Sequence, residues 1–373
     1  MTTMPIVYVR ESILSDMPFL IAAAGSAGFQ TVNVPPTEAK WGETFDKSFQ
    51  SFRATNNPSD RKYLFSVLSA PRQDAIPVGS SSLIAVNGTP EIPLFSYRII
   101  NEDNRRYLDL VENIHGPAEV GALVVYDACQ GDKNIGKNIA IVSGGETYTI
   151  QPTGRYGLTA SLVRFFLAGM PPIKANFEGR DCLSEFLPPY NLQDKERHRT
   201  NAFFEDIVRP VFRKSFDEID QATGNNRNLF KELPRRVSID SLPPQTQALI
   251  GIAGDGSQGA VRLLEQIGFK YADQVYPLDG GPDYIGLFDQ NPIFTGIKEY
   301  LLQNHAPSLA DSGWQYGFSG YYNKDRNPCF AACSGPVFLD GNSVHLPRET
   351  SQILNLSPGE PVTICLIPER DKT

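Results

Sequence analysis

The sequence predicts an α+β protein in which helices flank a mixed central sheet, with inserted segments and a small β-rich module at the C-terminal end. Three observations predict this class. Residues 5–10 alternate like a strand and lead into a helix-forming segment. Residues 158–170 and 259–268 carry apolar residues at helical spacing. From residue 328 onward the chain consists of short strand-like runs divided by Gly and Pro.

The N-terminal part of the chain predicts two helices after its first strand. Ser15 and Asp16 can cap the first helix, because Pro18 then falls in the first turn, where a missing N–H does no harm. Thr37 can cap the second helix. Aromatic residues recur in that helix at spacings of three and four, and we expect them in the core: Trp41, Phe45, Phe49 and Phe52.

Strand-like runs dominate the next hundred residues. Within 101–145 the polar, glycine-bearing stretch at 129–137 has no clear period, so this region is predicted as strand plus loop. The last run leads through a glycine turn at 153–157 into the helix at 158–170. Residues 173–180 are predicted as a further strand and the polar residues 181–199 as an inserted loop. The runs are 62–70, 80–88, 95–100, 120–128, 138–144 and 145–152.

The predicted division of the chain has two parts. Residues 1–290 form the core, with insertions near 101–145 and 181–245, the latter containing a helix kinked at Pro210. Residues 291–373 form a β-rich module packed on that core.

The composition predicts an ordinary globular protein. Its 34 basic and 42 acidic residues give a net charge of −8, which argues against nucleic acid and mildly favours a cationic substrate. The N-terminus does not have the pattern of a signal peptide, and apolar runs are shorter than the roughly 18 residues of a membrane span. The five cysteines are odd in number and scattered, which indicates a reducing compartment, so we expect a cytoplasmic protein with no membrane partner.

No metal site is expected. The four histidines are isolated in the sequence, and the closest cysteines, Cys329 and Cys333, have no second pair to complete a set of ligands.

Residues 251–271 fit two patterns. Gly254, Gly256 and Gly259 have the spacing of a dinucleotide-binding turn, with residues 248–253 as its strand and Asp279 placed to hold a ribose. This interpretation is the weaker one, because Pro277 would interrupt the second strand and too little chain follows to complete a doubly wound sheet.

The second pattern is that of an acyl-CoA N-acyltransferase. The helix at 259–268 ends at Gly268-Phe269, before a strand that begins at Lys270. Residues 148–166 add a strand, a glycine turn and a helix, whose first N–H groups and dipole can hold the pyrophosphate of coenzyme A. This arrangement resembles the GNAT fold of acyl-CoA N-acyltransferases. The apolar stripe of the first helix consists of Ala260, Leu263, Leu264 and Ile267.

The chain as a whole resembles the arginine N-succinyltransferase family, from residue 5 to about residue 367, most poorly at 101–145 and 181–200. The resemblance implies a GNAT-like fold and the transfer of a succinyl group from succinyl-CoA to the α-amine of arginine. It rests on the order of many fragments, among them Tyr97-Arg98, Pro152, Arg155, residues 201–212, 232–240, 248–254 and 260–269, Asp279-Gly280-Gly281-Pro282 and residues 356–369.

Three departures from the family pattern bear on the site. Gly254 stands where the family has a histidine assigned as proton donor. The coenzyme turn from Arg155 is one residue shorter than usual and has Thr159 where Gly or Ala is expected. The family's Met-Arg-Gly, on the strand after the coenzyme helix, is matched to residues 177–179, Phe-Glu-Gly, which reverses a charge and predicts a change in amino-acid specificity.

The candidate site residues follow from the chemistry of direct amine attack on a thioester. Glu146, at the head of its strand, can act as the base that deprotonates the amine, or can be a solvated strand-end residue. Asp255 can partly replace the absent histidine, although a turn aspartate is the simpler interpretation. The predicted coenzyme-binding residues are Tyr148, Thr149 and Ile150 at the thioester, and Arg155, Gly157, Leu158 and Thr159 at the pyrophosphate.

The predicted function is therefore N-acyl transfer from succinyl-CoA, or another acyl-CoA used as a co-substrate, to arginine or a related amine. No tightly bound cofactor is expected, and the protein is expected to form homo- or hetero-oligomers. The alternative is a non-catalytic subunit or ligand sensor on the same fold, which Gly254 and the shortened turn favour.

Overall fold

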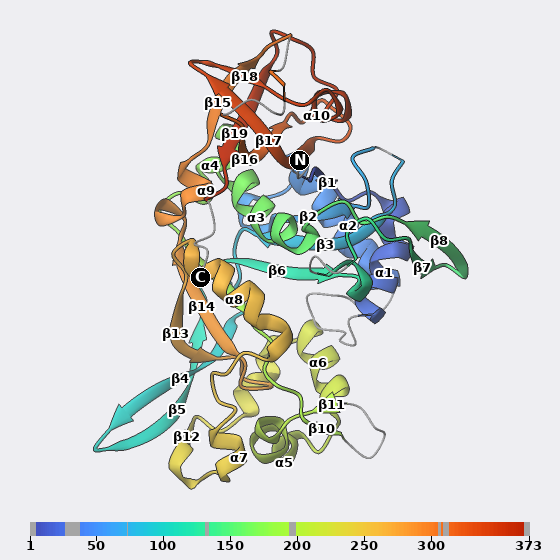
Figure 1. Cartoon of the computed structure of the whole chain (residues 1–373). Helices are drawn as coiled ribbons and strands as arrows, with labels where there is room; N and C mark the ends of the chain where they lie inside the picture. Colours follow the sequence, from blue (N-terminus) through green and yellow to red (C-terminus); the bar gives the residue numbers. More distant parts are fainter. Residues whose placement is uncertain are drawn as a thin grey trace. The chain divides into compact units, whose positions relative to one another are not determined.

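A computed structural model describes most of the chain (Figure 1). The chain folds into two compact units. The first unit comprises Met1–Ala85, Val120–Gly179 and Phe288–Thr373, and the second unit comprises Val86–Glu119 and Arg180–Leu287. The proposed helix cap Thr37 lies outside the described residues, which are 5–26, 38–72, 74–130, 134–193, 199–304, 307–308 and 313–368.

The first unit is built on one sheet with the strand order β6-β3-β2-β1-β17-β16-β19-β15-β18. Every residue of β1 is buried, and so is every residue of β2 after the first, because both faces of the sheet are covered. The strands are β1 (Val7–Glu11), β2 (Lys62–Leu68), β3 (Pro77–Ile84), β6 (Ala118–Val125), β15 (Lys298–Leu302), β16 (Gln315–Tyr322), β17 (Phe330–Asp340), β18 (Ser343–His345) and β19 (Pro361–Leu366).

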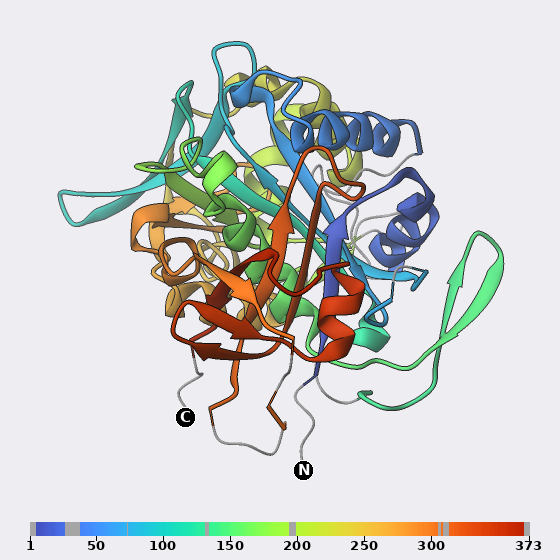
Figure 2. The same ribbon diagram turned by 90° about the horizontal axis from the view of Figure 1, so that it is seen from above.

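Three helices cover this sheet. Figure 2 shows α1 (Met17–Ser26) and α2 (Glu38–Phe52) on one face and α3 (Tyr156–Ala168) on the other. The predicted aromatic stripe of α2 is confirmed for Trp41, Phe45 and Phe52, which are buried. Phe49 is 57% exposed, and the Arg53 guanidinium lies 3.6 Å from the centre of its ring, so this one residue belongs to the surface.

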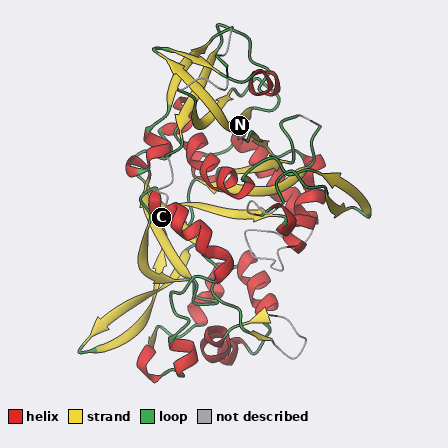
Figure 3. Cartoon of the chain, in the orientation of Figure 1, coloured by secondary structure: helices red, strands yellow, loops and turns green. Residues whose placement is uncertain are grey.

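In the second unit the strand order is β12-β5-β4-β13-β14-β9, and Ala118 and Glu119, the first residues of β6, pair with β9. The helices α6 (Phe216–Asn225) and α8 (Gln258–Gln266) belong to this unit. Figure 3 shows the helices and strands of the chain in the orientation of Figure 1. Its strands are β4 (Leu94–Glu102), β5 (Arg105–Asn113), β9 (Asp181–Glu185), β12 (Arg236–Ser238), β13 (Lys270–Val275) and β14 (Pro282–Leu287).

Two short hairpins complete the strands, β7 (Ile139–Ser143) with β8 (Glu146–Ile150), and β10 (Leu192–Gln193) with β11 (Arg199–Thr200). The remaining helical segments are α4 (Pro171–Lys174), α5 (Arg209–Phe212), α7 (Pro244–Gln247), α9 (Pro292–Thr295) and α10 (Arg348–Ile353).

The division into units differs from the predicted division at residue 290. The second unit does end near that point, at Leu287, but the chain that follows joins the N-terminal residues, because β17 pairs with β1 along Val7 to Arg10. The C-terminal segment is rich in strands, as predicted, and it belongs to the sheet of the first unit.

Two predicted strands were wrong, and one observed strand was not predicted. Residues 173–180 are the end of α4 and a turn, and the strand of this region is β9, inside the predicted loop. Residues 248–251 form a turn, so the strand that a dinucleotide-binding pattern requires does not precede Gly254. The polar segment after residue 101 contains β5, which forms a hairpin with β4.

Within the part of the chain that the structure describes, none of the helices combines the length and the apolar character that crossing a bilayer demands.

Candidate active site

The start of α3 is fixed by its neighbours in the first unit. The Tyr156 hydroxyl donates to the Ser69 carbonyl at 2.7 Å and accepts from the Thr153 N–H at 3.0 Å. A β-carbon on Gly154 would lie 2.6 Å from the Val7 side chain, so only glycine allows the turn to pass this close to β1. The glycine turn and the helix that follows it are therefore confirmed as a rigidly positioned pair.

The first turn of α3 presents the predicted pyrophosphate-binding groups. Arg155 occupies the N-cap position and no side chain caps the helix. Gly157 and Leu158, the second and third residues of the helix, are half-buried, while Arg155 is exposed. N–H groups at these positions have no acceptor within their own helix and carry the positive end of its dipole. The N-terminal end of α3 is therefore suited to bind an anion.

Thr159 differs from its neighbours in this turn. Its hydroxyl is buried and lies 2.6 Å from the Ser334 hydroxyl of β17, and its N–H donates to the Arg155 carbonyl at 3.1 Å. Both polar groups that Thr159 could offer a phosphate are thus engaged inside the protein. We leave Thr159 out of the coenzyme site, in contrast to the sequence prediction.

Glu146 lies in the β7–β8 hairpin, directly after two glycines with positive φ angles, Gly144 and Gly145. It is exposed and accepts a hydrogen bond of 2.7 Å from the Tyr148 hydroxyl, which raises the pKa of that tyrosine. Thr149 is also exposed, whereas Ile150 is buried. The prediction that Glu146 begins a strand is confirmed, and among the described strands this strand, β8, pairs only with β7.

A strand of the main sheet has a feature that the sequence did not reveal. Ala122, within β6, has a φ of 48°, which lies in the left-handed region that alanine rarely adopts. Its carbonyl accepts a hydrogen bond from the Ser80 hydroxyl at 3.2 Å. An alanine in a sequence does not predict a positive φ angle, so only the structure reveals this irregularity in β6.

The second unit holds Gly254 and Asp255. The Gly254 N–H donates to the Leu187 carbonyl at 2.8 Å, and a β-carbon on Gly254 would lie 2.9 Å from the Pro188 carbonyl oxygen. Asp255 is exposed and begins the short 3-10 helix Asp255–Ser257. The structure therefore assigns Asp255 to one unit and the predicted residues of 146–159 to the other.

Two further predictions about the site differ from what the structure shows. Asp279 is buried and accepts hydrogen bonds from the Tyr190 hydroxyl at 2.6 Å and from the Gly281 N–H at 2.9 Å, so its carboxylate holds a turn. Residues 177–179 lie in a turn, and β9 is the strand that follows α3. The prediction that residues 177–179 lie on a strand is therefore wrong.

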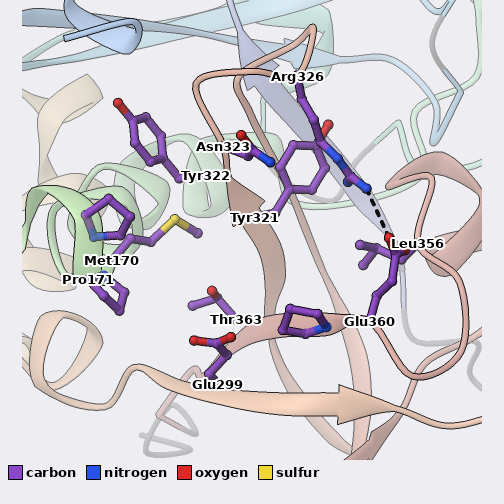
Figure 4. Close-up of a pocket in the computed structure, with 12 residues that line it drawn as sticks. Met170, Pro171, Glu299, Tyr321, Tyr322, Asn323, Arg326, Leu356, Glu360 and Thr363 are labelled. Carbon is purple, nitrogen blue, oxygen red and sulfur yellow. Dashed lines mark hydrogen bonds and ion pairs between the residues drawn. The ribbon is translucent and has the colours of Figure 1, made fainter.

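A pocket of about 290 Å³ in the first unit lies at the C-terminal end of α3, where Met170 lines it, and contains no predicted site residue (Figure 4). The Arg326 guanidinium reaches Glu360 at 3.4 Å and lies 4.6 Å from the centre of the Tyr321 ring. These internal contacts occupy the charged groups on one side of the pocket. Among the described residues, no cluster of three or more His, Cys, Asp or Glu side chains is arranged for a metal ion.

Comparison with known proteins relates the whole chain to one family. The family described as arginine N-succinyltransferase beta subunit matches residues 7–142 and 161–290. The segment between these two ranges contains β8 and the start of α3, where the sequence departs from the family's coenzyme turn.

Two curated relatives and one solved structure agree with this match. The arginine N-succinyltransferase subunit beta of Pseudomonas aeruginosa is 23% identical over 360 residues, covering 95% of this chain and 96% of the relative. The arginine N-succinyltransferase of Enterobacter sp. is 23% identical over 288 residues, 74% of each chain. The structure of arginine/ornithine succinyltransferase subunit AI from Pseudomonas aeruginosa has the same fold, with a TM-score of 0.72 at 16% identity over 98% of this chain and 100% of the other. The chain belongs to the arginine N-succinyltransferase beta subunit family.

Proposed function

We propose that the chain is an N-succinyltransferase that moves a succinyl group from succinyl-CoA to the α-amine of arginine or a related amine. The observation that carries this proposal is the family match along most of the chain, together with relatives that are named arginine N-succinyltransferase. Succinyl-CoA acts as a co-substrate that binds and leaves in each cycle.

The topology supports a GNAT-like arrangement. Strand β6 is followed by the inserted β7–β8 hairpin, the glycine turn, α3 and then β9. Ala118 and Glu119 of β6 pair in parallel with Cys182 and Leu183 of β9, so a helical crossover joins two parallel strands. A crossover helix that begins after a glycine turn suits a coenzyme pyrophosphate.

We assign the pyrophosphate to the N–H groups of Gly157 and Leu158, with the Arg155 guanidinium as a charged partner. Phosphate accepts such hydrogen bonds strongly, because the helix dipole and the guanidinium both oppose its charge. The thioester lies near a strand N–H, either at Tyr148, Thr149 and Ile150, as the sequence predicts, or at the irregular part of β6 around Ala122.

The reaction forms one C–N bond and breaks one C–S bond. The amine loses its proton to a base, attacks the thioester carbon and generates an oxyanion, which a backbone N–H stabilises. Collapse of this intermediate releases the thiolate of coenzyme A, which takes up a proton. Glu146 remains our proposed base, with the Tyr148 hydroxyl as its partner, and Asp255 the proposed acid.

A non-catalytic subunit is the second candidate, and one observation favours it. The close approach of Pro188 to Gly254 leaves no room for the histidine side chain that the family is expected to have there. The names of two of the relatives contain the word subunit, which supports the proposal of a homo- or hetero-oligomer. We also propose a cytoplasmic location, which is supported by the five buried cysteines, none of which forms a disulfide.

Calorimetric titration with succinyl-CoA, followed by a transfer assay, separates the two candidates. Binding with formation of succinylated amine is the result that the enzyme proposal predicts. Binding without turnover would support the non-catalytic subunit, and no binding would contradict the enzyme proposal.

A further inference from the structure

The second unit contains three carboxylates on one face of three neighbouring strands. Glu185 of β9 stands directly opposite Asp283 of β14 in the antiparallel register. Glu119 of β6 pairs with Leu183, which lies two residues before Glu185 and therefore on the same face of the sheet. Residues directly opposite in an antiparallel pair have β-carbons about 4.5–5.5 Å apart, and like charges there repel. We refer to Glu119, Glu185 and Asp283 as the acidic cluster.

Asp283 has no hydrogen-bond partner in this cluster. Its side chain is buried, with the residue 1% exposed, and among the described residues no donor is within hydrogen-bonding geometry of either carboxylate oxygen. The Ser96 hydroxyl is near enough to lower its pKa but does not meet that geometry. Burying a carboxylate without a hydrogen-bond donor costs free energy of folding. The Asp283 carboxylate is therefore available to accept hydrogen bonds from a bound ligand.

The cluster also has more negative than positive groups. Arg227 donates to the Asn87 side-chain oxygen, and the Asn87 amide donates to Glu119, which links one guanidinium to the cluster through an amide. Arg227 is also the basic group whose charge acts on Glu185. Arg227 is thus linked to Glu119 and Glu185, and burial together with the neighbouring acids raises the pKa values of Glu185 and Asp283.

The geometry favours an extended cation over a metal ion. In the described chain, no set of three acidic, histidine or cysteine side chains converges for metal binding, and the cluster is part of that chain. Oxygens that are spread along three strands suit a planar guanidinium, which carries five N–H donors in a fixed fork. Glu185 is only half-buried, so the cluster is not sealed from solvent.

We propose that the acidic cluster binds the guanidinium group of the amine acceptor, with Asp283 as its principal partner and Glu185 at its entrance. This inference rests on the proposed function for the identity of the acceptor. Asp283 and Glu185 then determine the specificity for an acceptor with a cationic side chain. The succinyl group is bound by other residues.

The test uses the full chain and two variants, Asp283→Asn and Glu185→Gln, with Asp181→Asn as the matched control. Asp181 is an exposed carboxylate at the start of the same strand as Glu185. Each protein is titrated calorimetrically with L-arginine and with L-citrulline, which has nearly the same shape but a neutral side chain. Binding of succinyl-CoA and the melting temperature are recorded for every variant.

The wild type is expected to prefer arginine to citrulline, and Asp283→Asn to weaken arginine binding about tenfold or more, because it removes a charge-assisted contact. Citrulline and succinyl-CoA binding should change less than twofold, and Asp181→Asn should resemble the wild type. Equal arginine affinity in Asp283→Asn and wild type would overturn the inference, as would a wild type that does not bind arginine.

Direct titration also separates this inference from the proposed function. Arginine binding that depends on Asp283, without any succinyl transfer, would support guanidinium binding by the acidic cluster. The same result would contradict the enzyme proposal. Succinyl transfer to arginine with a KM for arginine that Asp283→Asn leaves unchanged would support the enzyme and overturn the cluster.

Discussion

Gly254 and Pro188 approach so closely that a β-carbon at position 254 would lie 2.9 Å from the Pro188 carbonyl oxygen and 3.1 Å from its carbonyl carbon. Real β-carbons do not approach backbone atoms this closely, so any other residue requires residues 188–189 to move. The glycine and the proline segment therefore fit each other as a pair.

This relationship changes what a histidine at position 254 would do. From the sequence alone, Gly254→His could restore the family's proton donor. The structure predicts instead that the variant is destabilised by about 1–3 kcal/mol, as overpacked sites are, and gains no activity.

Gly256→His is the matched control, because a β-carbon there meets no atom within 4 Å and the residue lies in the short helix that follows Gly254. Thermal unfolding of both variants checks the prediction. A Gly254→His protein as stable as Gly256→His, or one with faster arginine succinylation than wild type, would show that the site can accept the side chain.

Arg155→Ala is expected to weaken succinyl-CoA binding without changing the melting temperature. A charge-assisted hydrogen bond to phosphate contributes about 1.5–3 kcal/mol, which corresponds to roughly ten- to hundredfold in the dissociation constant. Arg72→Ala, at a highly exposed arginine of the same unit, serves as the control. Equal affinities for the two variants would remove Arg155 from the coenzyme site.

Thr159 is expected to contribute to stability and not to coenzyme binding. Thr159→Val removes the hydroxyl that lies 2.6 Å from Ser334, and a double-mutant cycle with Ser334→Ala should give a coupling of about 0.5–1.5 kcal/mol in urea unfolding. Succinyl-CoA affinity should stay within twofold of wild type. An additive cycle accompanied by weaker succinyl-CoA binding would return Thr159 to the phosphate site.

The pKa of Asp283 predicts how stability depends on pH. Burial raises this pKa from 3.8 to about 7, so between these values the folded state holds a proton that the unfolded state has lost. The free energy of unfolding therefore falls as pH rises through that range, by about 1.4 kcal/mol for each pKa unit. The groups that face Asp283 and contribute are Glu119, Glu185 and Asp279, with Arg227 acting on Glu185.

Asp283→Asn should match the wild type at pH 4 and be more stable at pH 8, as measured by urea unfolding at both values. Asp181→Asn, on the surface of β9, should show no such dependence. A difference between Asp283→Asn and wild type that is the same at both pH values would contradict the raised pKa.

The sequence was sufficient to predict the elements whose pattern is local. The strand β1, the helix α2 and the turn into α3 all have a period or a glycine that specifies them. The buried Tyr156 and the close contact of Gly154 with Val7 explain in retrospect why that turn is so well defined.

The rest depended on contacts between distant segments. Residues 173–180 contain apolar side chains at strand-like spacing, but Pro171 and Pro172 open a helical turn there, and the strand forms at Asp181–Glu185. The acidic cluster was not predicted, because Glu119, Glu185 and Asp283 come together only through strand register. The left-handed Ala122 has no sequence signal at all.

The most direct test of the central claim is mass spectrometry of the purified chain incubated with succinyl-CoA and L-arginine, with free coenzyme A measured in parallel. Our account predicts succinylarginine and coenzyme A in equal amounts, at a rate that is proportional to protein and reduced by Arg155→Ala. Absence of succinylarginine, with the protein folded and succinyl-CoA bound, would contradict it.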